Sequence, residues 1–141
     1  MKDVEEGEEA EETEESLAAG RFVEIFLRHL LKGIDAKEKF VRLRVCQLIA
    51  LAMNSMGEIE YVPPPSPLGF LVDGSDDLFD DLRDRLGKRT RDRESSVRVQ
   101  AVIALARFQS SDDEAGIRVT KALIELLQHD PSAYVSLKVV Y

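Results

Sequence analysis

A stripe of apolar residues at helical spacing runs through residues 92–108. The stripe consists of Val97, Ala101, Ala104, Leu105 and Phe108. Asp92, Ser95 and Ser96 precede it, and their side chains can accept hydrogen bonds from the first free amides of a helix. The pattern predicts an amphipathic helix whose small residues allow a neighbouring helix to approach closely.

A similar segment occurs earlier in the chain, and a third begins near its end. Residues 43–52 (LRVCQLIALA) match residues 97–106 (VRVQAVIALA) at six of ten positions, with an offset of 54. Asp130 and Val135 follow Asp92 and Val97 with an offset of 38. A period of about 40 residues, built from helix pairs, is typical of HEAT repeats. The sequence therefore predicts an all-α fold, a HEAT-repeat α-solenoid of antiparallel helix pairs.

The same periodicity places the remaining helices. It predicts helices over residues 16–32 and 36–56, a third beginning at Ser75 or Asp76, a fifth through residues 117–127, and a sixth opening at Asp130. The inward positions expected in the first two helices are Phe22, Val23, Phe26, Leu27, Leu30 and Leu31, then Phe40, Leu43, Leu48, Leu51 and Ala52. Residues 17–141 are thus expected to hold two helix pairs, a fifth helix and a truncated sixth.

Between the first two repeat copies, helical periodicity disappears over residues 57–75. Four prolines within residues 63–67 favour an extended loop, which can hold the surplus length of the first offset. Such a loop serves as a spacer in the simplest interpretation. Ser66, followed by Pro67, also has the minimal form of a proline-directed phosphorylation site.

The charge of the chain is concentrated at its N-terminus. Residues 1–16 hold nine acidic residues and one lysine, a net charge of −8 that equals the net charge of the whole chain. This segment cannot bury enough apolar surface to offset its ordering entropy, so we expect a disordered acidic tail. The tail is either a solvated extension or a regulated segment that competes with nucleic acid for a basic surface.

The sequence offers no enzyme motif. It lacks a glycine-rich phosphate loop, a paired-cysteine metal spacing and a nucleophile elbow, so no catalytic residue, metal, cofactor or small-molecule substrate is expected. Cys46 is the single cysteine and is expected in or near the core. The absence of a long apolar run and of a basic-then-apolar leader predicts a chain in the cytosol or nucleus, without a membrane partner.

Basic residues gather around the predicted third turn. Seven fall within residues 83–98: Arg83, Arg85, Lys88, Arg89, Arg91, Arg93 and Arg98. A basic rim can contact DNA phosphates without reading bases, and the alternative is charge complementing the helix ends together with solubility. The candidate phosphate contacts are Lys88, Arg89, Arg91 and Arg93.

Two arginines suggest a structural role instead. Arg44 and Arg98 each follow an acidic residue by six positions, Glu38 and Asp92 respectively. Ion pairs from turn to helix, stacked along a solenoid, would use this spacing. We therefore predict structural ion pairs that involve Arg44, Arg98 and Asp92.

Two motifs are more specific than general HEAT sequence: Arg-x-Arg-Val-Cys-Gln-Leu at residues 42–48 and Lys-Arg-x-x-Asp-Arg-Glu at residues 88–94. With Asp-Pro-Ser-Ala at 130–133, they resemble the HEAT subunit of condensin, condensin subunit 3, and its fungal members most. The resemblance covers residues 21–133 and implies a fragment from the N-terminal region of a much longer protein. At position 136, where the family has arginine, this chain has Ser136.

The resemblance implies a non-enzymatic solenoid that supports mitotic chromosome condensation. Such subunits bind a segment of the kleisin subunit and together with it hold double-stranded DNA, while the SMC subunits, indirect partners, carry the ATPase. Lys88 and Arg89 match a basic pair of the family. The implied location is the nucleus and chromosome, with the cytoplasm possible outside mitosis. The alternative is a HEAT-type protein-interaction scaffold, such as a transport or phosphatase adaptor, with no DNA role.

Overall fold

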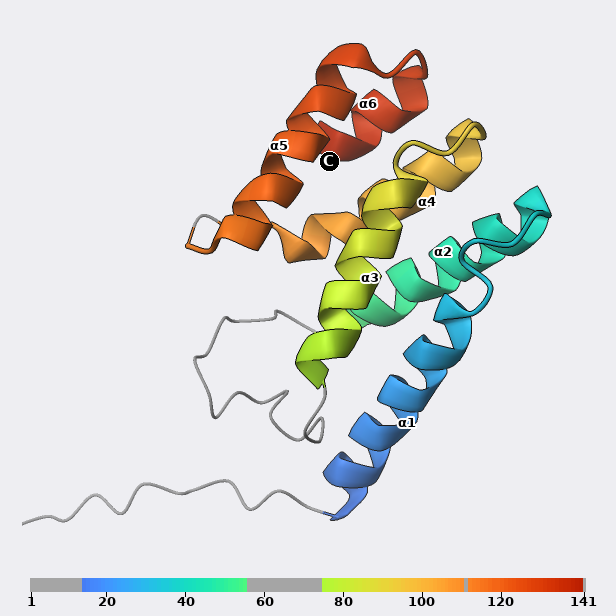
Figure 1. The fold of residues 1–141 in the computed structure, drawn as a ribbon, viewed down its shortest axis with the longest axis vertical. Coiled ribbons are helices and arrows are strands. Elements are labelled where there is room, and N and C mark those ends of the chain that lie inside the picture. The colour runs from blue at the N-terminus through green and yellow to red at the C-terminus, as the bar shows by residue number, and fades with distance from the viewer. Residues whose placement is uncertain (1–13, 56–74, 111, 141) are drawn as a thin grey trace, which may run out of the picture.

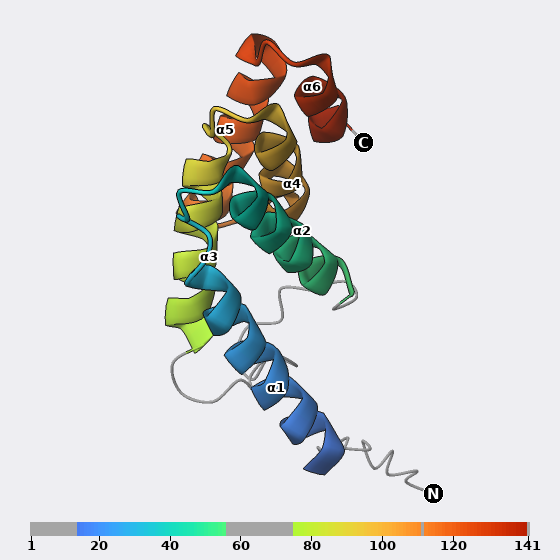
Figure 2. The same ribbon diagram turned by 90° about the vertical axis from the view of Figure 1, so that its right-hand side faces the viewer.

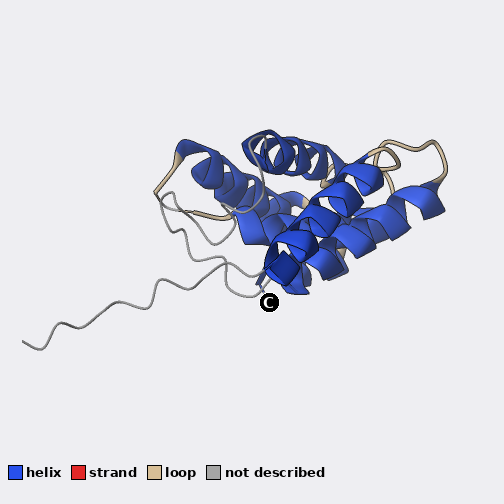
Figure 3. Ribbon diagram, turned by 90° about the horizontal axis from the view of Figure 1, so that it is seen from below, coloured by secondary structure: helices blue, strands red, loops and turns tan. Residues whose placement is uncertain are grey.

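The computed structural model describes residues 14–55, 75–110 and 112–140, and all regular structure in these residues is helical (Figures 1 and 3). The elements are α1 (Glu14–Leu31), α2 (Lys39–Ser55), α3 (Ser75–Arg89), α4 (Ser95–Leu105), the short 3-10 helix η1 (Ala106–Phe108), α5 (Glu114–His129) and α6 (Ala133–Val140). No helix of the described residues is long and apolar enough to cross a membrane. The prediction of an all-α solenoid of helix pairs is confirmed.

The helices form two layers. The even-numbered helices pack side by side, α2 against α4 and α4 against α6, and make the even-helix layer (Figure 2). Each odd-numbered helix packs against the even helix that follows it, and α1 also contacts α3. Each helix pair therefore repeats the same unit along the stack, as the repeated sequence predicts.

The core lies between the layers and continues through all three pairs. Its largest fully buried side chains are Leu27, Ile34, Ile49, Met53, Leu78, Leu82, Leu86, Leu105, Val97, Val102, Val135 and Cys46. Burying each aliphatic side chain of the leucine class stabilises the fold by about 1.5–3 kcal/mol. Since every pair contributes to one continuous core, no pair is an independent unit.

The central stripe lies where the sequence predicts it. Val97, Ala101, Ala104 and Leu105 are buried in α4, while Phe108 is half-buried in η1, with its ring centroid 6.3 Å from that of Phe79. The helix is shorter than expected because it begins at Ser95 and tightens into a 3-10 turn after Leu105. Position 94 caps it without a side-chain hydrogen bond.

The inward face predicted for α2 is correct only for Leu43 and Ala52, which are half-buried and pack against the core. Phe40, Leu48 and Leu51, all predicted to point inward, are 67%, 40% and 65% exposed. The core side of α2 consists of Arg42, Val45, Cys46, Ile49, Ala50 and Met53. α2 carries apolar residues around most of its circumference, so periodicity alone could not fix which side is buried.

Smaller corrections concern the ends of the helices. α1 begins at Glu14, so the last residues assigned to the acidic tail are helical, and α2 begins at Lys39 rather than at position 36. Phe22, expected inward, is 68% exposed in α1. α6 begins at Ala133, after the Asp130 turn. The rest of the acidic tail and the proline-rich loop, with Ser66, lie outside the described residues.

The start of α5 is packed tightly against the chain that precedes it. The carboxylate of Asp113 accepts a hydrogen bond from the Gly116 amide at 2.7 Å and caps the helix. A Cβ atom at Gly116 would meet the Cβ of Ser110 and lie 2.7 Å from its backbone nitrogen. Glycine is therefore required here by close approach of two backbone segments.

Candidate nucleic-acid interface

Arg42, near the start of α2, is buried and holds the turn of the following repeat. Its guanidinium donates to both carboxylate oxygens of Asp92, from Nε to Oδ2 at 2.8 Å and from Nη2 to Oδ1 at 3.1 Å. Nη1 donates to the backbone carbonyls of Ala36 and Lys37, each at 2.8 Å. The two charged side chains are only 6% and 2% exposed. This bidentate pair links α2 to the turn between α3 and α4.

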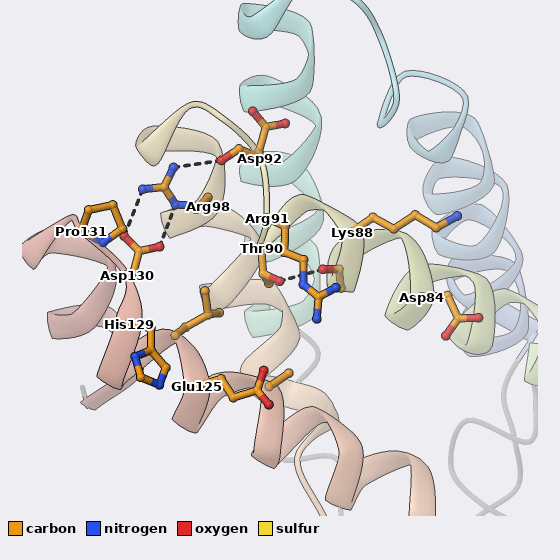
Figure 4. A pocket seen from close by; sticks show the side chains of 13 residues that line it. Asp84, Lys88, Thr90, Arg91, Asp92, Arg98, Glu125, His129, Asp130 and Pro131 are labelled. Atoms are coloured by element: carbon orange, nitrogen blue, oxygen red, sulfur yellow. Dashed lines mark hydrogen bonds and ion pairs between the residues drawn. The ribbon is translucent and has the colours of Figure 1, made fainter.

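Arg98 in α4 repeats this arrangement one unit further along (Figure 4). Its Nε donates to Oδ2 of Asp130 at 2.7 Å and its Nη2 donates to Oδ1 at 3.0 Å. Nη1 donates to the carbonyls of Asp92 and Arg93, at 2.9 and 3.3 Å. Asp92 and Asp130, which lie 38 residues apart in the sequence, therefore occupy equivalent positions in successive repeats.

The equivalence corrects the predicted ion pairs. Arg42 and Arg98 make the same contacts, so the first two copies are related by an offset of 56 and not of 54. Arg44 instead donates to Gln47 Oε1 at 2.9 Å on the exposed side of α2, and it makes no ion pair with Glu38. Arg98 and Asp92 do form structural ion pairs, but with Asp130 and Arg42.

Arg42 is the residue that the sequence analysis missed. The six-residue spacing does carry a signal, because Arg42 donates to the carbonyl of the residue six positions before it, as Arg98 does. That acceptor is a backbone carbonyl in both cases. An acidic residue six positions earlier is therefore not required, and searching for one selected Arg44 instead.

Arg89 also belongs to this buried network. Its Nη1 lies 3.0 Å from Asp92 Oδ2 and its Nη2 lies 3.4 Å from Asp35 Oδ1, and the side chain is 20% exposed. Burial by itself raises the pKa of Asp92. Hydrogen bonds from Arg42 and the Glu94 amide, together with the charges of Arg42 and Arg89, outweigh burial and hold that pKa below its usual value.

Three of the predicted rim residues face solvent. Lys88, Arg91 and Arg93 are exposed, and none makes an ion pair with a residue that the structure describes. We call these three residues the basic cluster. They lie at the end of α3 and in the turn before α4, which the Arg42–Asp92 pair holds in place.

A groove of about 620 Å³ lies beside the basic cluster, between the α3–α4 turn and the end of α5 (Figure 4). Lys88 and Arg91 line one side, and Glu125, Leu126 and His129 of α5 line the other. The groove carries both signs of charge. It therefore does not extend the basic surface of the cluster.

The remaining reactive side chains that the structure describes do not form a site. Cys46 is fully buried, and burial raises the pKa of its thiol to about 12, as suits a core residue. His29 and His129 are exposed on α1 and α5. Among the described residues, no group of three or more histidine, cysteine, aspartate or glutamate side chains could hold a metal ion.

The paired layers, the arginine–aspartate pair repeated at two successive junctions and the shared core define an α-solenoid of HEAT repeats. The chain is 41% identical over 113 residues to condensin complex subunit 3 of Schizosaccharomyces pombe, covering 80% of this chain and 11% of that protein. The Saccharomyces cerevisiae and human proteins of the same name are 38% and 32% identical over 82% and 92% of this chain. The chain belongs to the condensin subunit 3 family and aligns with one segment of each of these longer proteins.

A solved structure agrees with this assignment. The crystal structure of the S. pombe condensin Cnd3–Cnd2 subcomplex matches with a TM-score of 0.64 and 41% sequence identity, over 84% of this chain and 13% of that one. No protein-family model matches the chain. The chain spans about a tenth of the length of the curated relatives.

Proposed function

We propose that this segment takes part in the non-enzymatic work of condensin subunit 3, by helping to hold the kleisin subunit and by contacting the backbone of double-stranded DNA. Through the kleisin it would act beside the SMC ATPases on chromosomes in the nucleus and so support mitotic condensation. The related S. pombe protein forms a subcomplex with Cnd2, which supports the kleisin role. The relatives are condensin subunits, which favours this role over a transport or phosphatase adaptor.

The observation that carries the DNA role is the difference between paired and unpaired cations in residues 83–98. Four arginines of this stretch are engaged in ion pairs with carboxylates: Arg83, Arg85, Arg89 and Arg98. Lys88, Arg91 and Arg93 are exposed and make no ion pair with a described residue. Duplex phosphates attract such cations and release condensed counterions on binding, without any reading of bases.

Arg89 has a different part in this proposal. Both of its terminal nitrogens already contact carboxylates, so it fixes the turn that presents the basic cluster. A phosphate contact by Arg89 would have to compete with Asp92 and Asp35. We therefore assign the direct contacts to Lys88, Arg91 and Arg93.

The test is a salt series with a duplex of random sequence and a complex of this chain with the kleisin. Changing Lys88 and Arg91 to Glu should weaken binding to all duplexes alike and lower the slope of log affinity against log salt by about 0.9 for each phosphate that loses its cation. Lys121→Glu is the matched control, because Lys121 is exposed on α5 and belongs neither to the cluster nor to the lining of the groove. An unchanged slope in the double variant would show that this cluster does not contact DNA.

A further inference from the structure

The two layers of the solenoid differ in charge. The described even-numbered helices hold five basic residues and no acidic residue, whereas the odd-numbered helices hold ten acidic and eight basic residues. The five are Lys39, Arg42, Arg44, Arg98 and Lys138. Two of them, Arg42 and Arg98, are neutralised by the turn aspartates. The charged side chains that these three helices expose are therefore all positive.

The corrected repeat register shows how side chains line up across this surface. Offsets of 56 and 38 place Phe40, Ser96 and Tyr134 at equivalent positions on α2, α4 and α6. One turn further, they place Arg44, Gln100 and Lys138 at equivalent positions. Large side chains thus stand on α2 and α6, and small or polar ones lie on α4 between them. We call this arrangement the even-helix trough.

Further repeats in the stack would not cover the trough. Val41 and Leu48 of α2 are 44% and 40% exposed, but their equivalents in α4, Val97 and Ala104, are fully buried because α4 has neighbours on both sides. The exposure of Val41 and Leu48 thus reflects the position of α2 at the edge of the described layer. Ser96, by contrast, is exposed in α4 despite both neighbours. The row that Ser96 shares with the two aromatic residues therefore stays open in a longer solenoid.

The side chains of the trough require an apolar partner as well as an acidic one. Phe40 is 67% exposed and Tyr134 is 77% exposed, and the contact of a phosphate backbone would leave both rings without apolar cover. Leu51, at 65% exposure, continues the apolar stripe along α2. Arg44 and Lys138 follow the two aromatic residues by one helical turn. None of the three helices as described carries a carboxylate side chain, although Glu94, which caps α4, lies 3.7 Å from Lys39.

We propose that the even-helix trough holds a segment of the kleisin that carries both carboxylates and bulky apolar side chains. Neighbouring helices pack about 8–10 Å apart, so α2 and α6, on either side of α4, stand about 16–20 Å apart, which leaves room over α4 for one extended chain or one helix. The rings of Phe40 and Tyr134 pack against the apolar side chains, and Arg44 and Lys138 pair with the carboxylates. The inference rests on the proposed kleisin role and assigns it a surface distinct from the basic cluster.

The experiment uses this chain and overlapping peptides that cover the kleisin, with binding measured by fluorescence anisotropy beside a duplex DNA. Two variants address the trough, Phe40→Ala with Tyr134→Ala, and Arg44→Glu with Lys138→Glu. Phe22→Ala is the matched control, because Phe22 is 68% exposed but lies on α1 in the other layer. Each trough variant should lower the affinity for the kleisin peptide that binds the wild type by about tenfold or more, and the control should leave that affinity unchanged. Melting temperatures of all variants identify any loss of folding.

The outcomes separate this inference from the broader proposal. If kleisin peptides bind the wild type and both trough variants equally, the trough is not their site and only this inference fails. If no kleisin peptide binds the wild type, both this inference and the proposed kleisin role of the segment are wrong. If the trough variants lose the duplex but keep the peptides, the trough is a DNA surface and the inference is wrong.

Discussion

Replacing Asp92 with Asn should be among the most destabilising single changes at the polar positions of this chain. The carboxylate receives three guanidinium hydrogen bonds, from Arg42 twice and Arg89 once, and a fourth bond from the Glu94 amide. Asn keeps the shape but removes the negative charge. Arg42, whose side chain is 6% exposed, would then be a buried cation without a counter-charge.

The magnitude follows from the burial of the pair. Removing one partner of a buried ion pair costs about 3–5 kcal/mol. The lower end applies here, because the carbonyls of Ala36 and Lys37 continue to accept hydrogen bonds from Arg42 Nη1. A loss of about 3 kcal/mol should lower the melting temperature of a domain of this size by about 10 °C.

The assay is thermal and urea unfolding followed by circular dichroism. Glu114→Gln is the control, because its ion pair with Arg118 has the same 3.0 Å length as one Asp92 contact but both side chains are exposed. That control should leave the melting temperature unchanged. Adding Arg42→Met to Asp92→Asn should recover part of the loss, since it removes the uncompensated charge. A drop for Asp92→Asn no larger than that of the control would refute this reasoning.

Three further predictions concern glycine, cysteine and acid. Gly116→Ala should destabilise by about 1–3 kcal/mol through backbone overlap, whereas Gly87→Ala, with nothing within 4 Å of its Cβ, should stabilise α3 by about 0.5–1 kcal/mol in urea unfolding. Cys46, whose pKa is raised to about 12, should react with a thiol reagent at mildly alkaline pH only at the rate of unfolding. Asp92 and Asp130 have lowered folded-state pKa values, so their stabilisation is present above about pH 4 and should be lost as pH falls below it, seen as a falling urea midpoint.

The repeat unit could be predicted from the sequence, and the register of the first copy could not. The inward stripe through Val97 and Leu105 was correct, although Val99 and Ile103 give α4 apolar side chains outside the stripe as well. In α2 the best sequence match set Arg44 opposite Arg98. The contacts of Arg42 show that this match is two residues out of register, which corresponds to a rotation of about 200° around the helix axis.

The basic residues of the candidate site could be predicted from the sequence, but the ion pairs that hold its turn in place could not. The basic stretch around Lys88 is local in sequence, and the structure leaves part of it exposed at the predicted turn. The pairing of Arg42 with Asp92 joins residues 50 positions apart across the loop between the first two copies. Local spacing carries no information on such a contact, and only the packing of α2 against α4 brings the two residues together.

The paired arginines have a mechanical consequence. The guanidinium groups of Arg42 and Arg98 each donate to two backbone carbonyls of their own turn and to a carboxylate of the next turn. Each therefore cross-links two successive repeats. A pull along the stack must break such a pair before adjacent turns can separate. Ser136 occupies the equivalent position in α6, where its hydroxyl donates to the Leu127 carbonyl at 3.5 Å. Under load, the two junctions between the three described helix pairs should therefore resist separation, whereas Ser136 supplies no guanidinium at the equivalent position of α6.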